Sequence, residues 1–308
     1  MVNSFRDLCL NLPQFNAQSV ELGPVLGHGA TATAFKCSFN GKSCAAKVMK
    51  SEGDLGSTFD ESVATELLTL SKLGPHPNIV QCHGVCVDDA SAPIIILELM
   101  EGKDLEKYLS QLKPGFDLGR QTIQKWSLDL LSALDFLHNR DPILIHCDVK
   151  PANLLLTPCR TSLKLTDFGI AKSVDRRQRL EGQLKANEGS PRYRAPEVLS
   201  RSGTAAYTEK SDIYSAALVM YYLLTGRRPE NDVKVDPKWR PTLMAARMRW
   251  RKASDLLERM WAHEPEKRPT AGECAGLVRR FGEAEEDAPL PRGCYAGIRW
   301  PSQRRLVA

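Results

Sequence analysis

The sequence predicts an α+β protein in two parts, a small β-rich part followed by a larger helical part. The chain has 308 residues, of which 42% are hydrophobic, so it can bury a substantial core and is long enough for two lobes. Strand signals are concentrated before Gly102, and apolar residues at helical spacing dominate after it. This change of pattern along the chain indicates the order of the two parts.

The small part shows five main strand signals. An apolar run from Val20 to Leu26 leads into a glycine-containing loop, and two further apolar runs are joined by Asn40-Gly41, a strong hairpin dipeptide. Further strands are expected over 79–87 and 94–99. Apolar residues at helical spacing predict one helix among these strands, over 59–73. These signals predict a small antiparallel sheet with one helix inserted between its strands.

The larger part shows helical spacing in four segments, 105–112, 122–138, 211–224 and 253–263. The last segment of the chain, 283–308, is rich in Pro, Gly, Arg and Glu, a composition typical of a flexible tail. We therefore expect the folded domain to end near residue 282.

Composition argues against several kinds of protein. The net charge of +5 is modest, and no block of Lys and Arg is interleaved with aromatic residues, so no nucleic-acid partner is expected. The nine cysteines lack the paired spacing of a zinc site, which favours free thiols in a reducing compartment. The apolar runs are shorter than the ~20 residues of a membrane span, and no secretion signal is visible. An intracellular, cytoplasmic protein without a membrane span is expected.

One region of the sequence carries most of the chemical information. It reads His146-Cys147-Asp148-Val149-Lys150-Pro151-Ala152-Asn153 and is followed by Asp167-Phe168-Gly169. Here Asp148 can orient a hydroxyl and take its proton, and Lys150 can neutralise charge on a moving phosphoryl group. Asn153 and Asp167 offer the hard oxygen ligands that magnesium prefers on a nucleoside triphosphate. The order of these groups fits phosphoryl transfer.

This region resembles the catalytic loop and metal-binding loop of the eukaryotic protein kinases, H-R-D-x-K-x-x-N and D-F-G, with Cys147 in place of the family's Arg. The resemblance continues in the glycine-rich loop, 26–35, in the strand segment ending at Lys47, and in the activation-segment end, 189–197. It implies a bilobal kinase fold over 20–282 after an N-terminal extension, 1–19. The implied parts are a β-rich N-lobe with one C-helix (about 20–98), a hinge (98–102) and a larger helical C-lobe (103–282).

The resemblance also implies which residues bind ATP. The glycine-rich loop departs from the family pattern, because Ala32 replaces the third glycine and Ala34 replaces a valine. The hinge would bind the adenine edge, and a leucine after the catalytic loop would form the pocket floor. The implied ATP-binding residues are Leu26, Gly27, His28, Gly29, Ala30, Thr31, Ala32, Ala34, Ala45, Lys47, Glu98, Met100 and Leu155.

Roles in catalysis follow from the same resemblance. Asp148 is the implied catalytic base, Lys150 contacts the γ-phosphate, and Asn153 and Asp167 hold Mg²⁺. ATP and Mg²⁺ are thus the implied cofactors. Lys47 would pair with a carboxylate of the C-helix; Glu66 is preferred for its spacing, and Glu61 is the competing candidate.

The activation segment has implied structural roles. Ser190 would lie near the catalytic base, Glu197 would pair with Arg268, and Asp212 would hold the backbone of the catalytic loop. Kinases with an arginine at the position of Cys147 have a positive charge beside the base, which a phosphate on the activation segment commonly compensates. Cys147 has no such charge, so this need for a phosphate is weaker. We therefore predict that phosphorylation of the activation segment, for example at Ser173, is not the main switch.

Lys150 and the motif order favour a serine/threonine kinase acting on protein substrates. Met260-Trp261 before Glu264-Pro265 leans towards the tyrosine-kinase-like group, in its subclass that lacks the Arg-Asp pair. The alternative is a pseudokinase that binds partners, or binds nucleotide without turnover. The presence of every group expected to touch metal or phosphate argues against it. Phosphorylation of a small molecule is disfavoured because the peptide-binding segment, 189–197, is retained.

Overall fold

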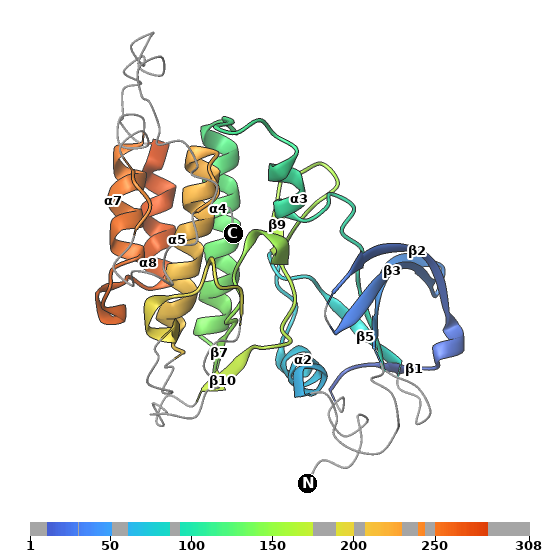
Figure 1. Ribbon diagram of the computed structural model, residues 1–308. Coiled ribbons are helices and arrows are strands. Elements are labelled where there is room, and N and C mark those ends of the chain that lie inside the picture. Colours follow the sequence, from blue (N-terminus) through green and yellow to red (C-terminus); the bar gives the residue numbers. More distant parts are fainter. Residues whose placement is uncertain are drawn as a thin grey trace, which may run out of the picture.

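The computed structural model describes the chain in eight segments. These are residues 11–29, 31–50, 61–86, 93–174, 189–199, 207–229, 240–243 and 250–282. They form a β-rich lobe and a helical lobe, seen at the right and left of Figure 1. The predicted α+β architecture is confirmed.

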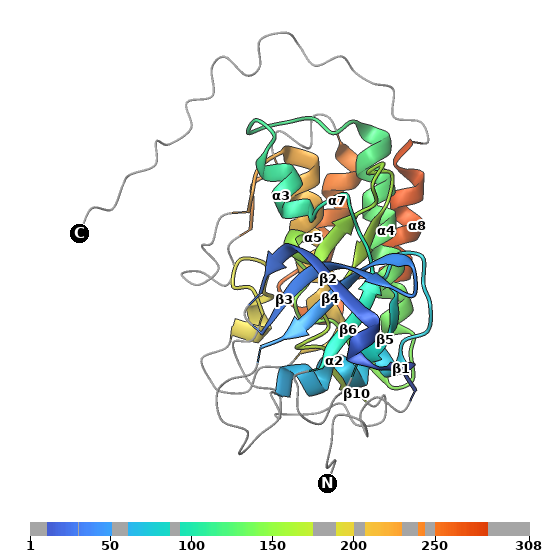
Figure 2. The same ribbon diagram turned by 90° about the vertical axis from the view of Figure 1, so that its right-hand side faces the viewer.

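The N-lobe is one six-stranded sheet with the order β1-β5-β6-β4-β3-β2. Only β1 and β5 pair in parallel; the other neighbours are antiparallel. Figure 2 shows the sheet in front of the helices of the C-lobe. Its elements are β1 (Gln14–Phe15), β2 (Val20–His28), β3 (Ala32–Phe39), β4 (Lys42–Met49), α2 (Glu61–Lys72), β5 (Cys82–Cys86) and β6 (Ile94–Glu98).

The predicted hairpin and helix of the N-lobe are present. Asn40 and Gly41 have φ values of 50° and 74°, the left-handed conformations that a tight turn between β3 and β4 requires. Helix α2 buries Val63, Leu67 and Leu70 on one face. That face packs into the main core, which extends from the N-lobe into the C-lobe.

The strand predicted to begin at Ile79 begins instead at Cys82. Ile79 forms an isolated bridge with Leu165 of the C-lobe. The backbone N–H of Val80 donates to the Leu165 carbonyl at 2.9 Å, and the Leu165 N–H donates to Asn78 at 2.8 Å. Since these backbone groups are already paired with the other lobe, they join the lobes rather than extend β5.

The C-lobe is built around α5, whose residues 211–224 are all buried. A helix that is apolar on all sides must lie in a core, and Figure 1 shows α4 and α7 beside it. Thr208 and Ser211 form a capping box at its start. The C-lobe elements are α3 (Leu105–Ser110), α4 (Arg120–His138), β7 (Ile143–Ile145), β8 (Leu154–Leu156), β9 (Leu163–Leu165), β10 (Lys172–Val174), α5 (Glu209–Thr225), α7 (Arg251–Met260) and α8 (Ala271–Arg279).

The described part of the C-lobe also contains four short 3-10 helices: η2 (Pro151–Asn153), η3 (Pro196–Leu199), η5 (Pro265–Lys267) and η6 (Arg280–Gly282). Another, η1 (Ala17–Ser19), precedes the N-lobe strand β2. No helix in the described segments is both long enough and apolar enough to cross a bilayer.

Candidate active site

Lys47 lies at the centre of an ion-pair network between the lobes. Strand β4 carries it, and its Nζ donates to both carboxylate oxygens of Glu66 on α2 at 2.6 Å. A third bond, 3.1 Å long, joins the same Nζ to Asp167. The pairing expected between Lys47 and Glu66 is therefore formed. The side chain of the competing candidate, Glu61, lies outside the described residues.

The charges of this network stabilise one another. Burial acts to lower the pKa of Lys47, but Glu66 and Asp167 outweigh it, so the pKa is raised. Burial acts to raise the pKa of Asp167, but Lys47 outweighs it, so the pKa is lowered. Burial raises the pKa of Glu66, an effect that Lys47 opposes. At neutral pH we therefore take Lys47 as a cation and Asp167 as an anion.

Asp148 is held in one orientation by three donors. Its Oδ2 accepts from Lys150 Nζ at 2.5 Å and from Asn153 Nδ2 at 3.1 Å, and its Oδ1 accepts from the backbone N–H of Ser190 at 2.8 Å. Asn153 also donates to the Asp148 carbonyl at 2.9 Å. The structure thus brings together the three predicted catalytic residues and the start of the predicted peptide-binding segment.

The backbone beside Asp148 is strained and anchored. Cys147 has a φ of 66°, a left-handed conformation that is uncommon for a residue with a side chain. Asp212, buried on α5, accepts the backbone N–H of His146 at 2.8 Å and that of Cys147 at 3.0 Å. His138 of α4 contacts the same carboxylate at 2.9 Å. The anchoring of the catalytic loop expected of Asp212 is present. The contact of His138 with Asp212 was not predicted.

Gly189 has to be a glycine to approach this loop. Its φ is 81°, and a Cβ there would lie 2.7 Å from the Cys147 carbonyl oxygen and 3.4 Å from Asp148 Oδ1. Ser190 can therefore reach Asp148 because the preceding residue carries no side chain.

The glycine-rich loop connects β2 and β3. Gly27 lies opposite Ala34, and the N–H of Gly29 donates to the Ala32 carbonyl at 2.8 Å. Ala34 in turn lies opposite Lys47. Of the predicted ATP-binding residues of this loop, Leu26, Gly27, His28 and Ala34 lie on the paired strands, Gly29 and Thr31 lie between them, Ala32 is buried in the core, and Ala30 lies outside the described residues.

The predicted hinge follows β6. The backbone N–H of Glu98 donates to Gln81 at 2.9 Å, so it is already paired and leaves the carbonyl as the group that Glu98 can offer to an adenine. Its side chain pairs with Lys164 at 2.7 Å. Ala45 lies opposite Leu97 in the sheet, and Met100 follows the strand.

Gly102 brings the predicted floor residue next to the hinge. The N–H of Gly102 donates to the Leu156 carbonyl at 3.1 Å, and a Cβ at Gly102 would lie 2.2 Å from the Thr157 carbonyl oxygen. Only glycine fits this approach. Strand β8 thereby lies along the hinge, and its Leu155 bridges to Asp104.

The end of the activation segment is tied to the C-lobe by a buried ion pair. Arg268 is 1% exposed and donates to both carboxylate oxygens of Glu197, at 2.7 and 2.8 Å. Its other N–H groups donate to backbone carbonyls of Ala262, Lys210 and His263. The expected pairing is present, and all five guanidinium N–H groups have acceptors.

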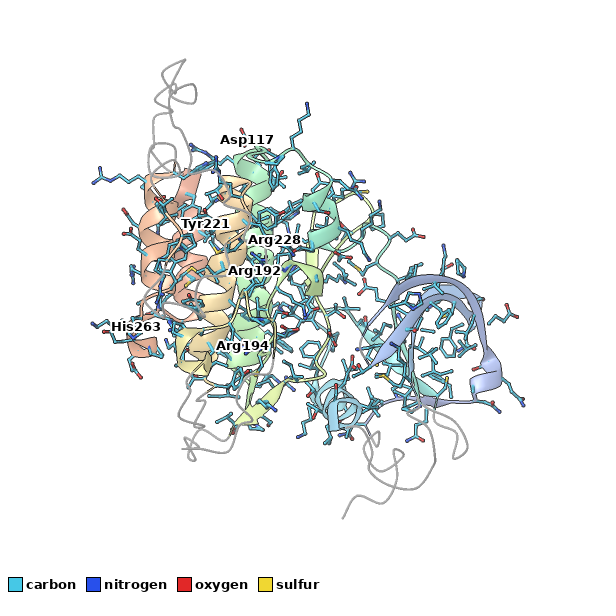
Figure 3. The ribbon with its side chains drawn as sticks, viewed as in Figure 1. Asp117, Arg192, Arg194, Tyr221, Arg228 and His263 are labelled. Carbon is cyan, nitrogen blue, oxygen red and sulfur yellow. The ribbon has the colours of Figure 1, made fainter. Side chains whose placement is uncertain are left out.

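Sequence reasoning missed the residues that surround Tyr193. Arg192, Arg228 and Glu106 lie near this buried tyrosine, and Figure 3 labels both arginines. They come from separate parts of the chain: Glu106 is on α3, Arg192 follows Ser190, and Arg228 follows α5. No local pattern connects three such residues, so only the folded arrangement reveals the cluster.

Comparison with known proteins agrees with this geometry. The family model described as protein kinase domain matches residues 20–277. Mitogen-activated protein kinase kinase kinase 7 of Homo sapiens is 29% identical over 296 residues, which cover 92% of this chain and 46% of that protein. Serine/threonine-protein kinase STY46 of Arabidopsis thaliana is 30% identical over 298 residues, covering 92% and 49%. The chain thus spans about half the length of these two relatives.

Proposed function

Because the chain belongs to the protein kinase family, we propose that it transfers the γ-phosphate of ATP to serine and threonine hydroxyls of protein substrates. The observation that carries this proposal is the set of hydrogen bonds and ion pairs that connects the charged residues of the two lobes. Lys47 contacts both Glu66 and Asp167, while Asp148 is fixed by Lys150 and Asn153. Phosphoryl transfer depends mainly on positioned charges, and these contacts hold the charges that it needs close together.

The chain offers suitable ligands for Mg²⁺. Asp167 is a carboxylate whose pKa is lowered and whose side chain is 44% exposed, and Asn153 supplies an amide oxygen. Such oxygen ligands, few in number, suit an ion that shares its coordination with nucleotide phosphates. When bound there, Mg²⁺ would neutralise charge on those phosphates. Asn153 and Asp167 are the residues that would hold it.

The remaining groups have separate tasks. Lys47 binds the α- and β-phosphates, and Glu66 holds the lysine in place. Asp148 orients the acceptor hydroxyl and takes its proton, since its carboxylate is fixed by donors on both oxygens. Lys150, next to Asp148, neutralises charge on the transferred group. The Glu98 carbonyl and Met100 bind the adenine edge, between Ala34, Ala45 and Leu155.

Two further features support the finer assignments. Lys150 favours serine and threonine acceptors, in agreement with the name of the plant relative, serine/threonine-protein kinase STY46. Cys37 and Cys44 lie directly opposite each other on β3 and β4 and are both free thiols, which supports a reducing, intracellular location.

A radiolabelled transfer assay tests the proposal. The full chain is incubated with labelled ATP, Mg²⁺ and a generic basic protein, and the labelled amino acid is identified after hydrolysis. We expect phosphoserine and phosphothreonine, and a loss of about 10²-fold or more in Asp167→Ala. Asp255→Ala, an exposed carboxylate on α7, is the matched control. Transfer no higher than that of Asp167→Ala would favour a pseudokinase instead, and label on tyrosine alone would contradict the acceptor class.

A further inference from the structure

A cavity of about 360 Å³ opens beside the catalytic loop. It includes Lys150 and Ser190, so it adjoins the place where an acceptor hydroxyl would meet Asp148. Its wall is formed by α3, the catalytic loop, the end of the activation segment and the turn after α5. The lining residues are Glu106, Lys150, Ala152, Ser190, Pro191, Arg192, Tyr193 and Arg228.

The charges of this cavity do not cancel. Lys150 pairs with Asp148 at 2.5 Å, and Arg228 pairs with Glu106 at 2.7 Å. Arg192 has a neutral partner instead, since its Nη1 donates to the Pro229 carbonyl. Three cations and one acid line the cavity, and among the described residues both Lys150 and Arg228 already have a carboxylate partner. The surplus positive charge is therefore that of Arg192.

Tyr193 adds a neutral donor to the wall. It is 5% exposed, and its hydroxyl has no hydrogen-bond partner of good geometry within the described segments. Burial and the Glu106 carboxylate raise the pKa of this hydroxyl, while Arg228 and Arg192 oppose the rise. The group thus stays protonated at neutral pH, and a buried donor of this kind gains by meeting an acceptor.

We propose that this cavity binds an anionic side chain of the protein substrate, a carboxylate or a phosphomonoester, located within a few residues of the acceptor hydroxyl. The inference rests on the proposed kinase function, because it places the acceptor at Asp148. Guanidinium groups match the planar fork of a carboxylate or the oxygens of a phosphate. Arg192 provides the uncompensated charge, and Arg228, paired with Glu106 and 53% exposed, lies at the rim.

A basic substrate residue fits this cavity poorly. Among the described residues that line it, the only acid is Glu106, and this carboxylate is already paired with Arg228. A substrate lysine or arginine would have to displace that pair and would meet the charge of Arg192. The cavity therefore selects acidic or phosphorylated sequences over basic ones.

Peptide turnover and peptide binding, measured together, test the inference. Each peptide has one acceptor serine and, at one flanking position in turn, phosphoserine, glutamate, alanine or lysine. We expect a kcat/KM about tenfold higher for the best anionic peptide than for its alanine counterpart. Arg192→Gln should reduce that ratio towards one, and Arg192→Lys should restore part of it. Arg251→Gln, an exposed arginine on α7, should leave the ratio unchanged. Glutamate and phosphoserine peptides distinguish the two sources of the charge.

Fluorescence anisotropy of the same peptides, without ATP, separates this inference from the kinase function. If the wild-type protein phosphorylates alanine and anionic peptides equally well, the inference is overturned and the kinase function stands. If no peptide is phosphorylated but anionic peptides bind more tightly in an Arg192-dependent way, the cavity is supported and the kinase function is not. Absence of both turnover and selective binding overturns both. Should Arg192→Gln fail to fold, as judged by its melting temperature, Arg228→Gln replaces it.

Discussion

A single buried carboxylate, Asp212, fixes the backbone of the catalytic loop. It accepts the N–H groups of His146 and Cys147, and the second of these residues has a left-handed φ of 66°. A non-glycine residue keeps such a conformation only when its surroundings enforce it. The position of Asp148, one residue further, thus depends on a side chain that never meets the substrate.

Asp212→Ala should lower both stability and phosphoryl transfer. It leaves the buried N–H of His146 and the partly buried N–H of Cys147 without acceptors, at a cost of up to roughly 1–3 kcal/mol each. Urea denaturation measures the change in unfolding free energy, and transfer is measured at a temperature where the variant remains folded. Asp255→Ala, exposed on α7, should change neither quantity. An Asp212→Ala protein with wild-type stability would contradict the anchoring role.

Cys147 itself changes the expectation about regulation rather than chemistry. The residue is half-buried and its thiol donates to the Ile145 carbonyl, and the network of Lys47, Glu66 and Asp167 is assembled with cysteine at this position. Because position 147 is a cysteine, it adds no positive charge beside Asp148 that a phosphate would have to neutralise. That activation-segment phosphorylation is not the main switch stays a prediction.

Among the elements, β10 provides the test of that prediction. Ser173 is exposed on this short strand, which pairs with β7 through Leu144. Because the strand is already paired without a phosphate, Ser173→Ala should retain most of the transfer activity. Steady-state kinetics are measured for Ser173→Ala, which removes the hydroxyl, and for the neighbouring Lys172→Ala, which alters β10 without removing a hydroxyl. Abolished activity in Ser173→Ala alone would contradict the prediction.

The segment from Pro265 to Arg279 joins the end of the activation segment to α8. Arg268 lies between η5 and α8 and uses all five N–H groups, two of them on Glu197. Replacing one partner of a buried ion pair leaves the other charge uncompensated.

Arg268→Ala should therefore lower the unfolding free energy by about 3–5 kcal/mol. Denaturant midpoints of the wild type, Arg268→Ala and Arg268→Lys provide the measurement, and the lysine variant should recover only part because it lacks the planar fork. Arg279→Ala, exposed at the end of α8, serves as the control. An Arg268→Ala midpoint equal to that of Arg279→Ala would disprove the structural role of the ion pair.

Helix α8 is an element that the apolar pattern of the sequence does not predict. The segment carries a capping-box signal, Thr270 followed by Glu273, and both reciprocal bonds are formed. The apolar pattern predicts no helix there, because the buried face of α8 consists of Ala271, Cys274, Ala275 and Val278, three of them small. Small residues give a weak apolar period, so in this case the cap was the stronger signal.

Across the whole molecule, long apolar periods and motif order were enough to predict the two lobes and their main elements. The same motifs predicted which charged residues meet, including Lys47 with Glu66 and Glu197 with Arg268. Contacts made by residues without such motifs were not predictable. The bridge from Ile79 to Leu165 and the cluster around Arg192 depend on packing between distant segments.

The packing of the N-terminal extension on the N-lobe sheet is another contact that the sequence did not predict. Strand β1 pairs in parallel with β5, and the ring of Phe15 lies edge-on to Phe39 with centroids 4.6 Å apart. Phe39 belongs to a small second core beneath the sheet, and Phe15 packs against that core. The described part of the extension, from residue 11 onwards, thus covers the N-lobe sheet.

A variant beginning at Val20 should therefore be less stable than the full chain. Full burial of such a side chain is worth about 1.5–3 kcal/mol, and since Phe15 is only half-buried, loss of its contacts should cost less than that. Thermal and urea denaturation compare this variant with Phe15→Ala, which should account for most of the loss, and with Gln18→Ala, an exposed control. Equal stability of the full chain and the shortened variant would mean that β1 contributes nothing.

The central claim is that the assembled groups around Asp148 transfer phosphate, and Asp148→Asn tests it most directly. ATP affinity is measured by calorimetry, and transfer to a serine peptide by single-turnover kinetics. Since Asp148 acts on the acceptor hydroxyl and not on the nucleotide, the variant should bind ATP as the wild type does and lose about 10²–10⁴-fold in transfer rate. Transfer at the wild-type rate by Asp148→Asn, or no transfer by either protein, would contradict the account.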